Sequence, residues 1–400
     1  MKIALCIRAL QLDGVSHTAM LMGQVLRDAG HDVFILSPYP RRPAGNILRD
    51  GLKYFPVGQG RWESERGLMK RMGRLFRKES FDVVFILSGL PVPMFEESLS
   101  LIPDHTSVVP VILGDRDHVY EPLERMASAW NAAVAISPRL LEETRRRIPG
   151  KSIRLLCHGI ESPAPVEVQF RSRHSSPLKL LYIGRLFGRK NVGMLPGILT
   201  ECRKRGTDCR LTIVGHGPER GSLEHHLREG GVDHIVDFRE APDQGCLHEL
   251  IREHHALVFP SSPGEGLGLV LLEAQANGCV PVASRIPGVT DYAIEDGVTG
   301  FLAECGDPAS FAKQIALLTE AVRWRTMSMA GRERMRTNFG EAVMGSELHG
   351  LLEELRSGAY RLPASRSGLY REKTCISSRV PRALKTLLKM CRKAVAPIQG

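Results

Sequence analysis

Residues 256–284 read ALVFPSSPGEGLGLVLLEAQANGCVPVAS, and this stretch indicates the fold class. The apolar run ALVFP has the length and composition of a buried strand, and a turn rich in serine, proline and glycine follows it. The next segment, LGLVLLEAQANG, predicts a helix that ends at Gly278, and VPVAS predicts a second strand. A strand, a helix and a strand in this order are typical of a parallel sheet, because parallel strands need a crossover connection.

The same alternation extends in both directions from this stretch. Continuous apolar runs separated by amphipathic segments favour parallel strands that are buried on both faces. The predicted strands are KIALCIR, DVFILSP, LKYFPVG, DVVFILSG, SVVPVILG, AAVAISP and SIRLLCHG in the first part of the chain, and LKLLYIG, RLTIVG, HIVDF, ALVFPSS, VPVAS and GFLAE in the second.

The periodicity disappears between the two groups of strands, in the segment ESPAPVEVQFRSRHSSP. We therefore predict an α/β protein with two doubly wound, Rossmann-like domains facing a central cleft, since ligands bind such sheets at the carboxyl ends of the strands. The predicted parts are an N-terminal domain at residues 1–160, a linker at 161–177, a C-terminal domain at 178–339, a helix at 340–356 that returns to the first domain, and a basic tail at 357–400.

The composition fits this organisation and excludes several classes of protein. A chain of 400 residues, 43% of them hydrophobic, can bury a sizeable core and is long enough for two domains. No apolar run has the length of a spanning helix, and nine cysteines without C-x-x-C spacing suit reduced thiols, so we expect a cytoplasmic protein. Walker A, G-x-S-x-G and H-E-x-x-H motifs are absent, and no G-x-G-x-x-G follows the first strand, which disfavours ATPases, α/β-hydrolases, zinc proteases and dinucleotide dehydrogenases.

Charge is concentrated at the C-terminal end. The sequence has 54 Lys or Arg and 44 Asp or Glu, and from Arg356 onward it has 11 basic residues and one acidic residue, Glu372. The net charge of +10 therefore belongs to this segment, which points to an anionic partner. Apolar residues between Val380 and Ile398 recur at helical spacing opposite basic ones, and predict an amphipathic helix over residues 379–398 that binds an anionic membrane surface.

Two other interpretations of the tail are weighed against a membrane helix. A disordered basic extension is the main alternative, because the segment lacks aromatic anchors. Binding to nucleic acid is not expected, since only Tyr360 and Tyr370 offer stacking surfaces. A second basic stretch at residues 64–79, SERGLMKRMGRLFRKE, could join the same membrane contact through Lys70 and its neighbours.

Four segments of the second domain carry polar or glycine residues where a strand ends. LLYIGRLFGRKNV places Arg185 and Lys190 after a strand, with Asn191 predicted to begin a helix, and this combination suits a diphosphate. LTIVGHGPER has Gly215 in a turn where backbone must approach something closely. SRIPGVTDYAIEDGVTGFL adds another glycine-containing turn, with Asp291.

The remaining segment carries two glutamates in an apolar setting. Glu265 is predicted at the cleft mouth and Glu273 inside the following helix. If both glutamates were helical, eight rises of the helix would separate them by about 12 Å. This exceeds the roughly 5–9.5 Å between the two catalytic carboxylates of a glycosidase. Two carboxylates this far apart can instead grip two parts of one ligand; the alternatives are helix-dipole compensation for Glu265 and a core-edge ion pair for Glu273.

These motifs together resemble a known family. The ordered set of Gly184-Arg185 with Lys190, Gly215 and Gly217, Pro260-Ser261, Glu265 seven residues before Glu273, and Asp296-Gly297 with Thr299-Gly300 resembles the retaining glycosyltransferases of family 4 over about residues 1–356, most strongly from 178 to 304. The resemblance implies the GT-B fold, with an acceptor domain followed by a nucleotide-sugar domain. It implies transfer of a hexosyl unit from a nucleotide-sugar, UDP-sugar before GDP-mannose, to a glycan or lipid-linked acceptor in cell-envelope or polysaccharide synthesis, without a metal or other cofactor.

The resemblance also implies roles for individual residues. Arg185 and Lys190 would hold the diphosphate, Glu265 would complete the catalytic set by holding the transferred sugar, and Glu273 would bind the ribose. The other donor-binding candidates are Gly266, Leu267, Gly268 and Leu269, whose backbone would cap the phosphates, together with Gly14, Gly215 and Arg239.

The sequence departs from the family pattern at several positions. A single Gly14 stands where a Gly-Gly pair is frequent, and Arg239 stands where the base-reading loop often has glycine. The histidine that often ends the strand matching residues 108–113 is either lost or displaced to His118. Asp115, Asp117 and His118 are therefore acceptor candidates, or simply a solvated polar loop.

Two rivals to a transferase follow from the same residues. A sugar-nucleotide epimerase would use the same donor grip but would form product without an acceptor. A non-catalytic, membrane-associated GT-B scaffold would keep the fold without turnover. The set of Arg185, Lys190, Glu265 and Glu273 argues against the scaffold.

Overall fold

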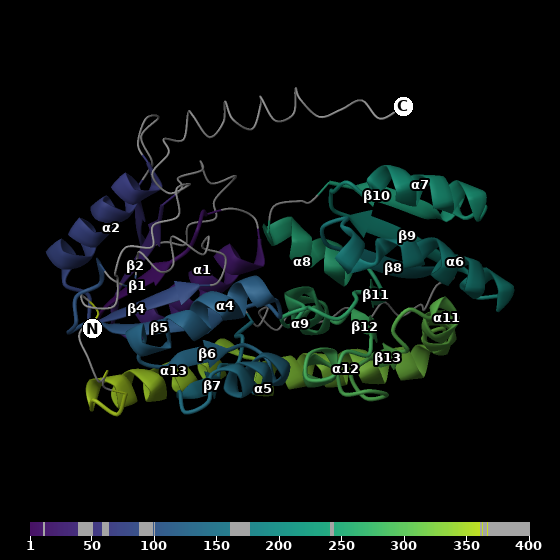
Figure 1. The fold of residues 1–400 in the computed structure, drawn as a ribbon. Helices are drawn as coiled ribbons and strands as arrows, with labels where there is room; N and C mark the ends of the chain where they lie inside the picture. The colour runs from purple at the N-terminus through teal and green to yellow at the C-terminus, as the bar shows by residue number, and fades with distance from the viewer. Residues whose placement is uncertain are drawn as a thin grey trace, which may run out of the picture. The chain divides into compact units, whose positions relative to one another are not determined.

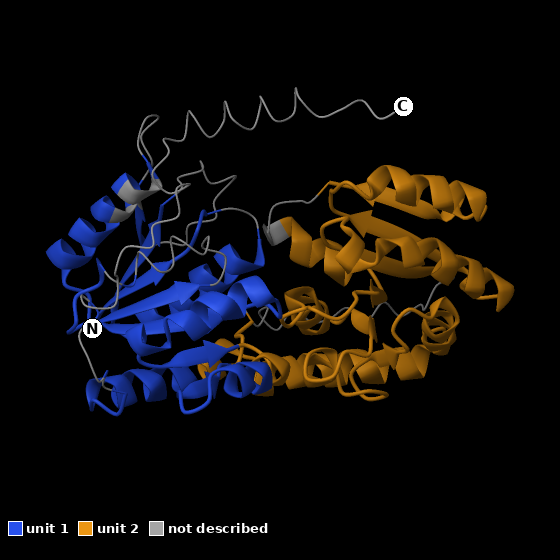
Figure 2. Cartoon of the chain, viewed as in Figure 1, with its two compact units in different colours: residues 1–135, 141–156, 345–400 blue, residues 136–140, 157–344 orange. Residues whose placement is uncertain are grey.

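The structure is a computed structural model that describes residues 1–10, 13–38, 51–57, 64–87, 99, 101–160, 177–240, 244–360, 362 and 366. The chain divides into two compact units, shown in different colours in Figure 2. Unit 1 comprises residues 1–135, 141–156 and 345–400, and unit 2 comprises residues 136–140 and 157–344. All of the predicted linker except Pro177, and the predicted tail helix at 379–398, lie outside the described residues.

Unit 1 is built around a parallel sheet of seven strands, in the order β3-β2-β1-β4-β5-β6-β7 (Figure 1). The interior strand β1 pairs with β2 on one side, Ile3 opposite Val33, and with β4 on the other, Ile3 opposite Val83. The order reverses at β1, as in doubly wound sheets. The elements are β1 (Lys2–Cys6), α1 (Gly14–Asp28), β2 (Asp32–Ser37), β3 (Lys53–Pro56), α2 (Glu65–Glu79), β4 (Val83–Leu87), β5 (Ser107–Ile112), α4 (Asp117–Arg125), η1 (Ala127–Ala129), β6 (Ala133–Ala135), α5 (Pro138–Arg147), β7 (Ile153–Leu155) and α13 (Glu341–Arg356).

Unit 2 contains a second parallel sheet, of six strands in the order β10-β9-β8-β11-β12-β13. Its first strand, β8, lies at the centre between β9 and β11, so the order again reverses at the first strand. The elements are β8 (Leu178–Ile183), η2 (Gly188–Lys190), η3 (Val192–Met194), α6 (Leu195–Lys204), β9 (Cys209–Val214), α7 (Arg220–Glu229), η4 (Asp233–Ile235), β10 (Val236–Arg239), α8 (Gln244–Arg252), β11 (Ala256–Phe259), α9 (Leu269–Ala276), β12 (Val280–Ser284), α10 (Thr290–Ala293), β13 (Phe301–Ala303), α11 (Pro308–Leu317) and α12 (Ala321–Asn338).

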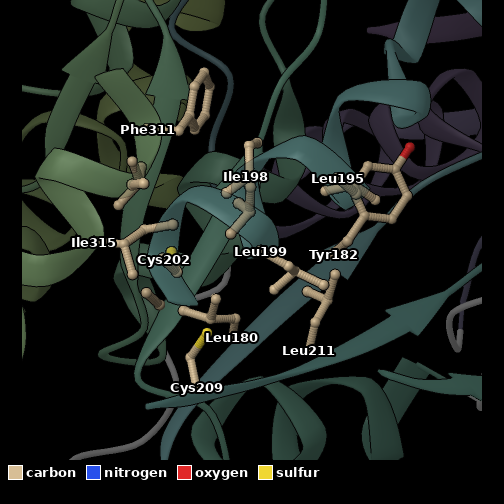
Figure 3. Close-up of a cluster of buried hydrophobic side chains, with 14 of the residues drawn as sticks. Leu180, Tyr182, Leu195, Ile198, Leu199, Cys202, Cys209, Leu211, Phe311 and Ile315 are labelled. Carbon is tan, nitrogen blue, oxygen red and sulfur yellow. The ribbon is translucent and has the colours of Figure 1, made fainter. Parts of the chain in front are cut away.

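The core of unit 2 explains why the apolar runs of the sequence form strands. Leu180 and Tyr182 of β8 pack with Ile198 of α6 and Phe311 of α11 in one buried cluster (Figure 3). Because side chains alternate along a strand, Leu181 points to the opposite face, where it is also fully buried. Every run predicted as a strand contains one, and the prediction of two doubly wound α/β units is confirmed.

One local prediction is wrong. Asn191 does not begin a helix: it has a left-handed backbone conformation, with φ of 50°, between the short turns η2 and η3. Helix α6 begins only at Leu195, with Pro196 in its first turn. Asparagine tolerates the left-handed region because of its short polar side chain, so it turns the chain here before the helix starts.

A residue beyond α13 is anchored in unit 1. Arg366 has no exposed surface and donates hydrogen bonds to the carbonyls of Ala129, Pro103 and Thr106 at 2.7–2.8 Å and to Oδ1 of Asn131 at 2.7 Å. These acceptors precede β5 and β6, so they lie at the amino ends of those strands. Among the described helices, none is both long and apolar enough to cross a membrane.

Candidate active site

The candidate site of unit 2 is built from loops that follow neighbouring strands. β9, β8, β11 and β12 are adjacent and parallel, with Ile183 opposite Val214 and Phe259 opposite Ala283. Parallel strands end at the same edge of a sheet, so the loops after these four strands lie side by side. The loops after β8 and β11 are also joined directly, because the Ser262 N–H donates to the Arg189 carbonyl at 3.1 Å.

Glu265 is the centre of the charged part of this site. It lies in the loop after β11, its residue is only 5% exposed, and its Oε1 atom is 2.9 Å from Nζ of Lys190 and 3.0 Å from Nη1 of Arg189. The structure thus brings together Glu265 and Lys190, which the sequence analysis had singled out separately. It adds Arg189, which the sequence analysis missed although it directly precedes Lys190.

The electrostatics of this cluster keep a buried carboxylate ionised. Burial alone would raise the pKa of Glu265, but the positive charges of Lys190 and Arg189 outweigh it and hold the pKa below its ordinary value. Burial lowers the pKa of Lys190, and the neighbouring cations Arg189 and Arg185 act in the same direction, while Glu265 opposes them. Lys190 also lies 5.2 Å from the centre of the Phe259 ring. The cluster therefore presents an excess of positive charge around one anion.

Arg185 has a different environment from Lys190. Its side chain is exposed and its guanidinium lies over the ring of Phe187, 5.4 Å from the ring centre. No ion pair of Arg185 is found in the part of the chain that the structure describes. An exposed cation beside two partly buried cations suits an anionic ligand that arrives from solvent.

Helix α9 carries the second glutamate. It begins after Gly268, whose φ of 80° is left-handed, and within the described residues no side chain caps its N-terminus. Its first N–H groups therefore remain available to an anion. Leu269 opens the helix, and Leu267 before it is buried.

Glu273 is partly exposed in the second half of α9, and its surroundings differ from those of Glu265. Protein packed around the carboxyl group raises its pKa to about 7, with burial as the cause. Among the described residues it has no ion pair, so the core-edge ion pair considered from the sequence is not found there. A carboxyl group without a protein partner is suited to accept or donate hydrogen bonds to ligand hydroxyls.

Gly215 and Gly217 have a packing role that explains why both are glycine. A Cβ atom on Gly215 would lie 1.9 Å from the carbonyl oxygen of Gly184, and one on Gly217 would lie 2.2 Å from the carbonyl oxygen of Leu186. The Leu186 N–H also donates to the carbonyl of His216 at 2.9 Å. The loops after β8 and β9 thus pack backbone against backbone, and this contact positions Arg185.

The other candidate residues of unit 2 lie near the same edge or on the surface. Gly266 is buried in the loop between Glu265 and α9. Arg239 ends β10 at the surface, where its Nε is 2.7 Å from Oδ2 of Asp237. Asp291 lies in the first turn of α10.

The remaining candidates belong to unit 1. Gly14 begins α1 directly after Asp13, whose side chain caps the helix by accepting from the Ser16 N–H at 2.9 Å. Asp117 begins α4, so the polar segment around His118 is the first turn of a helix and not a loop. Two of the acidic acceptor candidates already have protein partners: Asp117 pairs with Arg147 at 2.5 Å, and Asp115 accepts from the Tyr120 hydroxyl at 2.9 Å, while His118 is exposed.

A metal centre is not formed by the described residues: no group of three or more His, Cys, Asp or Glu among them could hold an ion. The charged groups of the site in unit 2 are Lys190 and Arg189 on Glu265, the nearby Arg185, and the N-terminus of α9.

The chain has two Rossmann-like units, as the GT-B fold does, and solved structures share this fold. A HepE protein of Anabaena, solved in complex with UDP-glucose, matches with a TM-score of 0.73 and 15% identity, covering 88% of this chain and all of the other. Residues 177–321 match the family described as Glycosyl transferases group 1. This part of the chain is therefore similar to glycosyl transferases group 1, and it contains every charged residue of the site in unit 2.

Curated relatives agree with this assignment. The N-acetyl-alpha-D-glucosaminyl L-malate synthase of Bacillus anthracis is 24% identical over 80% of this chain and 88% of its own length. The GDP-mannose-dependent alpha-(1-6)-phosphatidylinositol monomannoside mannosyltransferase of Mycolicibacterium smegmatis is 33% identical over 44% of this chain and 47% of its own length. The chain spans about half the length of several curated relatives that it matches.

Proposed function

We propose that this protein is a glycosyltransferase that moves a hexosyl unit from a nucleotide-sugar to a glycan or lipid-linked acceptor. The observation that carries the proposal is the buried Glu265 carboxylate between Lys190 and Arg189. Close to it, the chain provides the exposed Arg185 and the uncapped start of α9. Together these groups match a ligand that joins an anionic diphosphate to a neutral sugar rich in hydroxyl groups.

The proposed chemistry is departure of the nucleoside diphosphate from the anomeric carbon. Negative charge grows on the leaving diphosphate, and Lys190, Arg185 and the N–H groups at the start of α9 stabilise it. No metal ion is part of the proposal, because these groups supply the positive charge. Glu265 positions the sugar by accepting hydrogen bonds from its hydroxyls.

The proposal includes retention of the anomeric configuration. In this scheme the bond from the anomeric carbon to the diphosphate oxygen breaks, and the acceptor oxygen forms its new bond on the same face of the sugar. The departing phosphate oxygen takes the proton of the acceptor hydroxyl. Glu265 is held by two cations, which lowers its basicity and suits a positioning role better than attack on carbon.

The donor is proposed to be a UDP-sugar, with GDP-mannose as the second candidate. Support for UDP comes from the Anabaena structure with UDP-glucose, and support for GDP-mannose from the Mycolicibacterium relative. Glu273 is proposed to bind the ribose hydroxyls, since its carboxyl group has no partner among the described residues. Arg239, at the end of β10, is proposed to lie beside the base.

The acceptor is proposed to be held at a membrane. The enzyme would act in the cytoplasm, peripheral on the inner face of the membrane, in synthesis of cell-envelope glycans, lipopolysaccharide or other polysaccharides. The basic segment after Arg356 supports this proposal, and so does α2, on which Lys70, Arg74 and Arg77 are exposed. Asp115, Asp117 and His118 remain the candidate acceptor contacts.

The test is a thermal-shift screen of the full chain against UDP-, GDP- and ADP-sugars, followed by product analysis. A bound donor raises the melting temperature according to its occupancy. We expect one nucleotide class to stabilise the chain and transfer to require an added acceptor. Product without an acceptor would indicate the epimerase, and donor binding without turnover on any glycan or lipid acceptor would indicate the scaffold.

A further inference from the structure

Arg189 contacts the loop of Glu265 in three ways. Its Nη1 atom is 3.0 Å from Oε1 of Glu265 and donates to the Gly264 carbonyl at 3.3 Å, and its own carbonyl accepts from the Ser262 N–H at 3.1 Å. The side chain is partly exposed, whereas the carboxylate that it contacts is buried. Arg189 therefore joins the loop after β8 to the loop after β11 on both sides of Glu265.

Two cations share one oxygen of Glu265, although one would be enough to neutralise it. Under the proposed function, Lys190 must turn toward the donor diphosphate, and the carboxylate would then lose its nearest partner. A buried carboxylate without a partner is costly and takes up a proton. A second cation that remains paired with Glu265 keeps the carboxylate ionised while Lys190 binds the diphosphate.

We propose that Arg189 is a positioning residue that holds Glu265 ionised and oriented while Lys190 binds the donor diphosphate. This inference rests on the proposed function and adds a residue to it. The charged and titratable groups around the carboxylate are Lys190 and Arg189 from η2 and Tyr182 from β8, with Arg185 acting on Lys190. Of these, Arg189 alone ties its side chain to the backbone of the Glu265 loop as well as to the carboxylate.

The first test uses the ligand-free protein and a double-mutant comparison. Arg189→Gln should lower the melting temperature of the wild-type chain at neutral pH. In the Glu265→Gln background the same change should not lower it, because Arg189 then faces Lys190 without a carboxylate between them. An equal loss in both backgrounds would overturn the proposal, since it would assign the effect to the Gly264 contact.

The second test uses turnover of the nucleotide-sugar that the screen identifies. Arg189→Gln should reduce kcat roughly tenfold, as expected for a displaced catalytic group. Removing a nearby cation raises the pKa of a carboxyl group, so the acidic limb of the kcat profile, which reports the donor-bound enzyme, should move up by about one pH unit. Arg189→Lys keeps the positive charge, so the acidic limb of its pH profile should return to the wild-type position.

The matched control is Arg203→Gln. Arg203 also donates to backbone carbonyls of glycines, those of Gly230 and Gly231 at 3.1 Å, but it contacts no carboxylate of the site. Its pH profile should coincide with that of the wild type. A profile of Arg189→Gln that also coincides with the wild type would overturn the proposal. If the wild type transfers no sugar, the proposed function fails, and the melting-temperature comparison still decides whether Arg189 acts through Glu265.

Discussion

At the scale of single residues, the two glutamates of the site have opposite electrostatic surroundings. Glu265 lies between Lys190 and Arg189, which keep it ionised in spite of burial. Glu273 has no such partner among the described residues, and burial raises its pKa to about 7. Environments that shift the pKa values of two carboxyl groups in opposite directions are typical of groups with different roles. We interpret Glu265 as the group near the reacting sugar and Glu273 as a group that binds the donor.

Glu265→Gln is predicted to lose most activity, on the order of 10²-fold in kcat, with the fold retained. Glutamine has the same shape but cannot pair with two cations. Glu273→Gln should instead mainly weaken donor binding, since a neutral amide accepts hydrogen bonds from hydroxyl groups less strongly than a carboxylate does. Steady-state kinetics with the identified donor measure both variants. Near-normal turnover of Glu265→Gln would remove that residue from the mechanism.

Glu273 should also make stability depend on pH. A carboxyl group with a folded-state pKa of about 7, against about 4.3 unfolded, stabilises the folded form below pH 4 and loses that contribution as pH rises through 7. Glu273→Gln removes this loss and should raise the melting temperature relative to the wild type above pH 7, by the equivalent of roughly 1–3 kcal/mol. Below pH 4 the two proteins should melt alike. A constant difference across the range would contradict the raised pKa.

The cations should act on turnover more than on donor affinity. Lys190→Ala and Arg185→Ala remove charge that faces a diphosphate whose own charge grows in the transition state, so both should lower kcat. Lys190→Ala should be the more severe, because it also deprives Glu265 of its nearest partner at 2.9 Å. Kinetics that change only the donor KM in both variants would rule out the transition-state role.

At the scale of elements, the site depends on loops that touch through their backbones. The loop after β9 packs on the loop after β8 at distances that leave no room for a side chain at Gly215 or Gly217. The loop after β11 is joined to the loop after β8 by Arg189. Neither contact belongs to a strand or a helix, yet together they fix where Arg185, Lys190 and Glu265 stand.

Gly215→Ala is predicted to destabilise unit 2 by roughly 2 kcal/mol, because a Cβ 1.9 Å from the Gly184 carbonyl oxygen forces the two loops apart. Turnover should fall even at temperatures where the variant stays folded, since the displaced loop carries Arg185. Gly221→Ala is the control: a Cβ there meets nothing within 4 Å, and alanine suits the helix α7 better than glycine. Gly215→Ala should therefore lower both the melting temperature and turnover, whereas Gly221→Ala should raise the melting temperature slightly and leave turnover unchanged.

At the scale of the whole molecule, the net positive charge and the folded units lie in different parts of the sequence. The net charge of +10 arises after Leu355, whereas the two sheets and the candidate site precede it. Arg366 fixes the start of the basic segment to unit 1 at the amino ends of β5 and β6. The carboxyl ends of parallel strands, where ligands bind, lie at the opposite edge of the same sheet. Arg366 is therefore held at the edge of its sheet that lies opposite the edge where ligands bind in such sheets.

Vesicle sedimentation tests the proposed role of the tail in membrane binding. The full chain should sediment with vesicles that contain phosphatidylglycerol at low salt, and less at high salt or with phosphatidylcholine alone, because each cation contributes up to about 1 kcal/mol near an anionic surface. A chain that ends at Arg366 keeps the buried anchor and should sediment much less. Equal sedimentation of the two chains would show that the tail does not have this role. Strong binding of vesicles by the chain that ends at Arg366 would point to α2.

The sequence by itself determined the strands, the two parallel sheets and which residues of unit 2 are candidates for a donor site. Apolar runs, turn residues and helix ends depend on a few neighbouring positions, so they can be recognised without a structure. The spacing of Glu265 and Glu273 and the cations after LLYIG were visible for the same reason. The exception, Asn191, failed because a left-handed turn and a helix start favour the same residue type.

Only the tertiary structure decided which of these residues meet. Arg189 and Glu265 are far apart in sequence and come together because β8 lies beside β11 in the sheet, although β9 and β10 come between them in the chain. Three other features also depend on the surrounding residues: the raised pKa of Glu273, the lack of room for a side chain at Gly215, and the burial of the Arg366 guanidinium. Strand and helix patterns are local, whereas desolvation, ion pairing and close packing are set by neighbours that only the folded chain supplies.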